Sequence, residues 1–183
     1  MMVGLTGMPG AGKSTAGQAL ESLGVKRVVM GDVIREETKR RGLQPDPENT
    51  GKVMRELRAK FGEAAVAELC LKKLLASSER FVIIDGIRSL AEVEAFRKAG
   101  NLLLIAIQAS RERRFRLLKE RGRSDDPLLW DTFVSRDERE LAIGLGNVIA
   151  LADEVVSNEH STPEDLGRMV VNIVTRWRQS LAG

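Results

Sequence analysis

The feature that most constrains the fold is a glycine-rich stretch near the N-terminus, which matches the pattern G-x-x-x-x-G-K-[ST] at every fixed position. It consists of Gly7, Met8, Pro9, Gly10, Ala11, Gly12, Lys13, Ser14 and Thr15. A short, mostly apolar run precedes it at residues 2–6, and residues 14–23 carry apolar side chains at helical spacing. Strand, glycine loop and helix is the arrangement that this motif needs, which disfavours a chance match.

These residue types together predict a site for ATP and Mg²⁺. The glycines let the backbone turn its N–H groups inward around phosphate oxygens, and the helix N-terminus adds positive potential. We expect Lys13 to reach the β- and γ-phosphates and the Ser14 hydroxyl to ligate Mg²⁺, with Thr15 lining the same helix start. We call residues 7–15 the P-loop.

Length and composition limit the classes of protein that the chain can be. At 183 residues it is most simply one domain with a sizeable core. It lacks the roughly 18 consecutive apolar residues of a membrane span, and its N-terminal apolar residues fit the first strand, so we expect no signal peptide. The single cysteine, Cys70, excludes an internal disulfide and suits a reducing cytoplasm, where we expect the protein to act. The one histidine, His160, stands apart from other metal ligands, so no transition-metal site is expected.

Strands alternate with helices along the chain, which predicts an α/β fold with a five-stranded parallel sheet between two layers of helices. The strands are expected at residues 2–6, 26–30, 81–85, 102–107 and 154–157. The helices are expected at residues 14–23, 33–41, 48–59, 63–76, 90–98, 111–121, 128–142 and from Thr162 onward. Since several helices separate the second and third strands, we expect an inserted helical subdomain over about residues 32–76.

Asp85 ends the third predicted strand, at the edge of the sheet outside which ligands bind in such folds. A carboxylate there can hold the Mg²⁺ shell directly or through water, or it can simply cap a turn. We favour the metal role, shared with Ser14, because an apolar strand ending in aspartate is the usual second half of a phosphate-loop site.

Two segments place a glycine, an acid and an arginine after a strand. They are Gly31-Asp32-Val33-Ile34-Arg35 and Asp85-Gly86-Ile87-Arg88. An arginine can bind a phosphate bidentately, and although one such arginine is usually a surface residue, two from neighbouring strand ends can hold the same anion. We therefore expect Arg35 and Arg88 to form a phosphate clamp.

The segment from residue 111 to residue 123 is strongly basic, which most often marks a solvated helix face. In a loop that folds over a triphosphate, however, arginines neutralise the moving phosphoryl group and exclude water. Arg121 and Arg123, which flank Gly122, are best placed for that role in a short lid over about residues 121–127. We expect the earlier arginines to face solvent or to pair with Glu112 and Glu120.

These motifs resemble those of nucleoside monophosphate kinases, adenylate kinase especially. Residues 7–15, Gly31-Asp32-x-x-Arg35, Asp85-Gly86-x-Arg88 and Arg121-x-Arg123 look like its phosphate loop, acceptor-binding segment, strand-end motif and lid. Residues 152–159 are similar to the end pattern of dephospho-coenzyme A kinase. Over nearly the whole chain, the motifs at residues 30–37, 85–88, 121–127 and 136–141 resemble an archaeal family of adenylate-kinase-related P-loop proteins, a resemblance that supplies no substrate.

The chain departs from adenylate kinase in three respects. Arg88 lies one residue closer to Asp85 because a Phe-Pro pair is missing, the long lid domain is absent, and no equivalent of the adenine-specific glutamine precedes the lid. The base preference of the acceptor site is therefore not predicted.

The resemblance implies transfer of the γ-phosphoryl group of ATP-Mg²⁺ to a small phosphate-bearing acceptor, bound by the helical subdomain. Lys13, Arg121 and Arg123 would stabilise the transferring group, and Arg35 and Arg88 would hold the acceptor phosphate. Asp32, at the acceptor, is structural if a phosphate accepts the group. If a hydroxyl accepts it, as in dephospho-coenzyme A, Asp32 would take the proton.

Two other classes of function remain open. An ATP-switched assembly factor for RNA or the ribosome could use the basic helix, but Phe115 is the only aromatic residue within it, so RNA is a less favoured partner. A regulatory ATPase is the other alternative.

Overall fold

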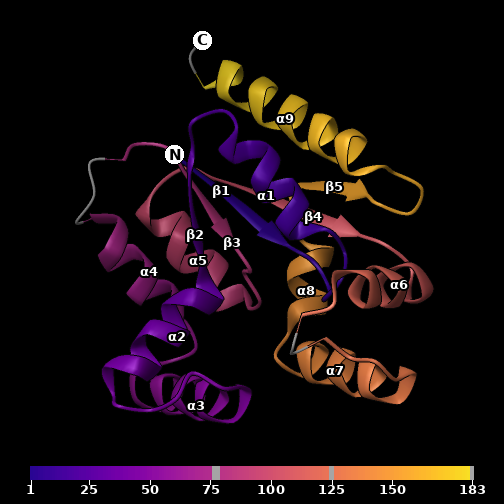
Figure 1. The fold of residues 1–183 in the computed structure, drawn as a ribbon. Helices are drawn as coiled ribbons and strands as arrows, with labels where there is room; N and C mark the ends of the chain where they lie inside the picture. Colours follow the sequence, from indigo (N-terminus) through magenta and orange to yellow (C-terminus); the bar gives the residue numbers. More distant parts are fainter. Residues whose placement is uncertain (76–78, 124–125, 182–183) are drawn as a thin grey trace.

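The structure is a computed structural model that describes residues 1–75, 79–123 and 126–181. Its central feature is a parallel sheet with the strand order β2-β3-β1-β4-β5. The strands are β1 (Met2–Thr6), β2 (Lys26–Val29), β3 (Val82–Asp85), β4 (Leu102–Gln108) and β5 (Glu154–Ser157). Because every pairing is parallel, the carboxyl ends of all these strands meet at one edge (Figure 1).

Helices connect these strands and cover both faces of the sheet. They are α1 (Lys13–Glu21), α2 (Met30–Arg40), α3 (Pro47–Phe61), α4 (Ala65–Leu75), α5 (Leu90–Ala99), α6 (Arg111–Arg121), α7 (Trp130–Ala142), α8 (Leu145–Ala150) and α9 (Pro163–Ser180). No helix in the described part of the chain is long and apolar enough to cross a membrane.

The strands divide their side chains between two apolar cores, as a period of two requires. Leu5, Ile83 and Ile105 point to the side covered by α1 and α9, which pack against each other. Ile84 and Leu104 point to the opposite side, where α4, α5 and α8 contribute apolar side chains. This confirms the predicted three-layer α/β/α fold of a P-loop kinase-like protein.

Two pairs of helices extend beyond the carboxyl edge of the sheet and flank it, α2 with α3 on one side and α6 with α7 on the other (Figure 1). The helices α2, α3 and α4 all lie between β2 and β3 and contact one another. Their function as an acceptor-binding subdomain, and the division of the chain into one domain with a short lid, stay predictions. Residue 76 of the predicted subdomain and residues 124–125 of the predicted lid lie outside the described residues.

Most predicted elements are confirmed within a few residues, and two differences affect the site. The helix α2 begins at Met30, directly after β2, so that Asp32 lies in its first turn rather than in a loop. The helix α8 was missed because Gly144 and Gly146 indicated a break. Instead Gly144, with a φ of 102°, is the N-cap of α8, which buries Leu145 and Val148.

A pair of mid-helix glycines tests the α1–α9 contact. A Cβ atom on Gly167 would lie 2.9 Å from the Cβ of Ala19, whereas a Cβ on Gly51 in α3 would meet only the end of the Arg55 side chain at 3.4 Å. We expect Gly167→Ala to lower the free energy of unfolding by about 1–3 kcal/mol through overpacking. Gly51→Ala should raise it by about 0.5–1 kcal/mol because alanine is the better helix former.

Urea denaturation of both variants beside the wild-type protein measures these changes. A stabilised Gly167→Ala protein would show that α1 and α9 are not in close contact.

Candidate functional site

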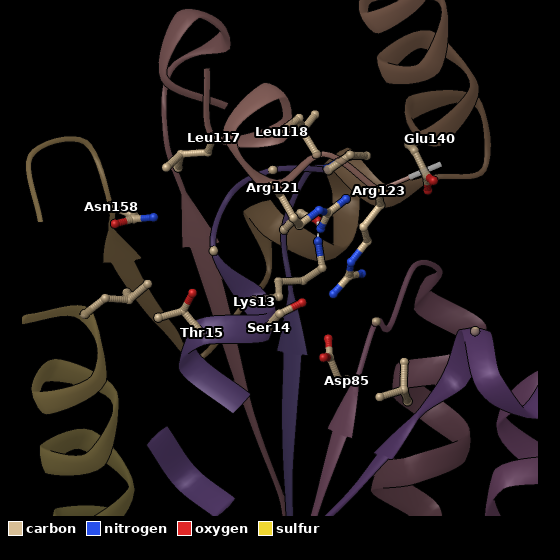
Figure 2. A pocket seen from close by; sticks show the side chains of 18 of the residues that line it. Lys13, Ser14, Thr15, Asp85, Leu117, Leu118, Arg121, Arg123, Glu140 and Asn158 are labelled. Carbon is tan, nitrogen blue, oxygen red and sulfur yellow. Dashed lines mark hydrogen bonds between the residues drawn. The ribbon is translucent and has the colours of Figure 1, made fainter. Parts of the chain in front are cut away.

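A cavity of about 490 Å³ opens at the carboxyl edge of the sheet, between the two pairs of flanking helices (Figure 2). On the P-loop side its lining includes Gly7, Pro9, Gly10, Gly12, Lys13, Ser14 and Thr15. Outside the P-loop, the lining includes Asp85, Arg35, Arg88, Arg121 and Arg123. The structure thus brings together nearly all of the predicted site residues. Asp32, Met8 and Ala11 are not among the described residues that line the cavity, and Ala11 is buried beneath the loop.

The P-loop has the backbone shape that a phosphate cradle requires. Gly10 and Gly12 have φ values of 82° and 109°, in the region that favours glycine. A Cβ on Gly10 would lie 2.6 Å from the carbonyl oxygen of Arg114, and a Cβ on Gly12 would lie 2.6 Å from the side chain of Asn158. No side chain caps the N-terminus of α1, which leaves its first-turn N–H groups available to an anion. These features fit the phosphates of a nucleotide.

Lys13 is held over this loop by the loop itself. Its Nζ donates hydrogen bonds to the carbonyl oxygens of Gly7, at 2.6 Å, and of Met8, at 3.1 Å. Burial lowers the pKa of Lys13 to about 8, while the negative charge of Asp85 acts in the opposite direction. The ammonium group is therefore already positioned where the motif predicts that phosphates bind.

Asp85 lies at the end of β3, buried beside Lys13 and Arg27. Burial raises its pKa above the usual value, and the charges of Lys13 and Arg27 oppose that rise. Arg27 Nη1 lies 3.4 Å from Asp85 Oδ2 and donates to the carbonyl oxygen of Ser14 at 3.3 Å. Sequence analysis assigned no role to Arg27. In the structure its guanidinium packs against Gly17, where a Cβ would lie 2.6 Å from Arg27 Nη1.

The donor set at this position suits Mg²⁺ rather than a transition metal. Ser14 and Asp85 offer oxygen ligands at the cavity wall, and Mg²⁺ uses few protein oxygens while keeping several waters. Within the described residues there is no group of three or more His, Cys, Asp or Glu side chains that could hold a metal ion.

Arg35 and Arg88 enter the cavity from separate elements, and each faces an acid. Arg35, on α2, donates from Nε to Asp32 Oδ1 at 3.0 Å, and the Asp32 side chain is 55% exposed. Arg88, in the segment after β3, places Nε 3.5 Å from Oε2 of Glu140 on α7. Sequence reasoning did not assign any role to Glu140.

Asp126 binds both arginines of the predicted lid, Arg121 through its side chain and Arg123 through its backbone. Arg121 donates from Nε to Asp126 Oδ2 at 2.9 Å, and Arg136 on α7 lies 3.5 Å from Asp126 Oδ1. Figure 2 shows Arg121 and Arg123 entering the cavity from the same side, above Lys13. Asp126 also accepts a hydrogen bond from the backbone N–H of Arg123 at 3.0 Å, which fixes the start of the predicted lid.

The prediction that the earlier arginines of α6 face solvent is wrong for Arg114, which is 4% exposed. Its guanidinium forms a fork with Asp137 of α7, at 2.8 and 2.6 Å, and donates to the carbonyl oxygen of Pro9 at 3.1 Å. It also lies over the ring of Phe133. A buried ion pair thus joins the P-loop to both α6 and α7.

Asn158 supports the P-loop from the other side. Its Nδ2 donates to the carbonyl oxygen of Ala11 at 3.0 Å from the end of β5, and the residue is buried. Sequence analysis included residue 158 only as part of an end pattern, without a role.

Comparisons with known proteins agree with this geometry. The profile of the AAA domain family matches residues 6–132. A UPF0200 protein of Methanocaldococcus jannaschii is 48% identical over 171 residues, covering 92% of this chain and 87% of that protein. The fold is similar to that of two shikimate kinases. The enzyme from Bacteroides thetaiotaomicron has a TM-score of 0.61 at 20% identity, covering 96% of this chain and 98% of that one. The enzyme from Acinetobacter baumannii, solved in complex with shikimate, has a TM-score of 0.60 at 16% identity, covering 96% and 93%.

The buried pair of Arg114 and Asp137 makes a prediction about stability. Asp137→Ala leaves the Arg114 charge buried without its partner, and should lower the free energy of unfolding by about 3–5 kcal/mol. The double variant Arg114→Met with Asp137→Leu removes both charges and should be more stable than Asp137→Ala alone.

The matched control is Glu138→Ala, which changes an exposed acid on the same helix and should cost at most about 0.5 kcal/mol. Urea denaturation supplies all three values. Equal effects of Asp137→Ala and Glu138→Ala would contradict the ion pair.

Proposed function

The chain belongs to the UPF0200 family of P-loop kinase-like nucleotide-binding proteins, and from this premise we propose that it transfers the γ-phosphoryl group of ATP to a small phosphate-bearing acceptor. One observation carries the proposal. A single cavity contains the P-loop with Lys13 and also two arginines, Arg35 and Arg88, that belong to neither the P-loop nor the lid. A protein that only bound and hydrolysed ATP would not need this second cationic group.

On the donor side, the P-loop would bind the phosphates of ATP through its backbone N–H groups and Lys13. Ser14 and Asp85 would hold Mg²⁺, which when bound neutralises charge on the β- and γ-phosphates. Lys13, Arg121 and Arg123 would stabilise the negative charge that spreads over the transferring group. No covalent intermediate on the protein is required, because phosphoryl transfer needs mainly placement and charge stabilisation.

On the acceptor side, Arg35 and Arg88 would hold the anionic group of the acceptor, and the helices α2 to α4 would close on it. A nucleoside monophosphate is the first candidate, as the motifs suggest. A hydroxyl acceptor, of which dephospho-coenzyme A is one example, is the second candidate, and the likeness to shikimate kinases supports a small-molecule acceptor of that kind.

The direct test is to incubate the protein with γ-labelled ATP, Mg²⁺ and one acceptor at a time: each nucleoside monophosphate, dephospho-coenzyme A, shikimate and water alone. We expect saturable labelling of one acceptor class. Lys13→Met should lower the transfer rate by at least about 10²-fold, because it removes charge stabilisation in the transition state. Arg88→Ala should raise the KM for the acceptor far more than the KM for ATP.

The control variant is Arg139→Ala on α7, an exposed position outside the cavity lining, which should behave as the wild type. Labelled inorganic phosphate as the only product, with every acceptor, would contradict the proposal and favour a regulatory ATPase.

A second prediction concerns Asp32, whose half-exposed carboxylate holds Arg35 in the structure. We expect Asp32→Asn to raise the KM for the acceptor several-fold through Arg35 while kcat changes by less than about tenfold. Steady-state kinetics with the acceptor found above separates the two constants. A fall in kcat of about 10²–10⁴-fold with a hydroxyl acceptor would instead show that Asp32 takes the proton.

A further inference from the structure

Glu140 on α7 is an acid in a cavity whose charged lining residues are mainly cationic. Its side chain is 13% exposed, and its Oε2 atom is buried without a hydrogen-bond partner among the described residues. The ion pair with Arg88 spans 3.5 Å from Nε to Oε2 and includes no hydrogen bond. A buried carboxylate oxygen left without a donor is unfavourable, so its retention in this position calls for an explanation.

Two other buried acids of this region are engaged in hydrogen bonds. Both oxygens of Asp137 accept from Arg114, and Asp126 accepts from the side chain of Arg121 and the backbone of Arg123. Glu140 differs from these two in having an oxygen that accepts no hydrogen bond from the described residues.

Holding Arg88 in place does not account for Glu140. A carboxylate that served only to orient an arginine would form a fork, as Asp137 does with Arg114. The backbone of Arg88 is already fixed by another acid, since its N–H donates to Glu92 Oε2 at 2.8 Å. Glu140 thus lies next to the predicted acceptor-binding arginine while its Oε2 atom accepts no hydrogen bond from the described residues.

We propose that Glu140 Oε2 accepts a hydrogen bond from the acceptor molecule, so that the acceptor carries a hydroxyl or amino group close to the anionic group that Arg88 binds. This inference rests on the proposed function, because it names the class of acceptor for the same cavity. In the free protein this oxygen is closed to solvent as well as unpaired, so the carboxylate must turn toward the cavity to meet the acceptor. An analogue without the donor would leave the oxygen unpaired and would bind more weakly.

The test compares matched ligand pairs on wild-type protein and on Glu140 variants. Calorimetry measures binding to the full chain with Mg²⁺ and a non-hydrolysable ATP analogue present. AMP against its 2′-deoxy and 3′-deoxy forms tests a hydroxyl donor, and CMP against UMP and AMP against IMP test an amino donor. On the wild type, we expect one pair to differ in affinity by about 10- to 100-fold.

On Glu140→Ala, the affinity ratio of that pair should fall to within about 3-fold, because the atom that distinguishes the two ligands is gone. Glu140→Gln keeps an uncharged acceptor oxygen and should give an intermediate ratio. Using a ratio cancels any change in the attraction between Arg88 and the anionic group, which both ligands share. The matched control, Glu138→Gln, alters an exposed acid two residues away and should keep the wild-type ratio.

The outcomes separate this inference from the proposed function. If the ligands bind and the ratio collapses in Glu140→Ala but no label is transferred, the proposed function fails and the inference stands. If label is transferred but the Glu140 variants keep the wild-type ratio, or no pair differs on the wild type, the inference is overturned. Failure of every one of these ligands to bind would overturn the inference, while the proposed function is overturned only if no acceptor at all is labelled.

Two controls exclude loss of the fold as a cause. Each variant should match the wild type in thermal unfolding and in affinity for the ATP analogue. Should Glu140→Ala not fold, the near-isosteric Glu140→Gln decides alone, and an unchanged ratio in it would count against the inference.

Discussion

The site depends on the contacts that hold the P-loop in its phosphate-binding shape. Two of its carbonyl groups are bound from outside the loop, by Arg114 at Pro9 and by Asn158 at Ala11. The same two neighbours leave no room for a Cβ at Gly10 and Gly12. With these two carbonyls engaged from outside, the loop can present N–H groups to the cavity, which is what an anion requires. Gly10 and Gly12 are therefore required for two reasons. Their φ values are positive, and Arg114 of α6 and Asn158, just after β5, approach them too closely for a side chain.

This arrangement also determines which helices can move with the nucleotide. Since Arg114 binds Asp137 and Pro9 together, α6, α7 and the P-loop share one buried polar contact. Breaking it would expose an unpaired buried charge, so we expect opening of the site to leave this contact intact. The α2–α3 pair contacts α4 through apolar packing and the exposed pair of Glu36 with Lys73, which is easier to exchange. At its other end, α3 is joined to α5 by the largely buried pair of Arg58 with Glu92, at 3.1 Å.

Much of this fold follows from the sequence, and the exceptions have identifiable causes. Buried strands such as β3 and the helix start at Thr162 are local signals, and both are confirmed, with Thr162 and Asp165 forming a capping box. The pair of Arg114 and Asp137 joins residues 23 positions apart on different helices, so no local pattern distinguishes Arg114 from the solvated arginines around it. The position of α8 was missed because a glycine before a helix looks the same as a glycine that ends one. The roles of the site residues are still predictions, but their convergence on one cavity followed from parallel strands alone.

Two of the helices that border the cavity follow one geometric rule, and it explains why Glu140 lines the cavity and Asp32 does not. On α2, Gly31 and Arg35 line the cavity, four residues apart on one face. On α7, Arg136 and Glu140 do the same. The residue one step around each helix, Asp32 or Asp137, is rotated by about 100° and faces elsewhere.

The early start of α2 therefore has a chemical consequence. Had β2 continued through Met30 into a loop, Asp32 would have been free to reach into the cavity, as its motif suggests. In the helix it pairs with Arg35 at the surface instead. The carboxylate that lines this part of the cavity is Glu140 of α7, and Asp137, three residues before it, is locked to Arg114. The buried ion pair thus fixes the register of α7 that places Glu140 at the cavity.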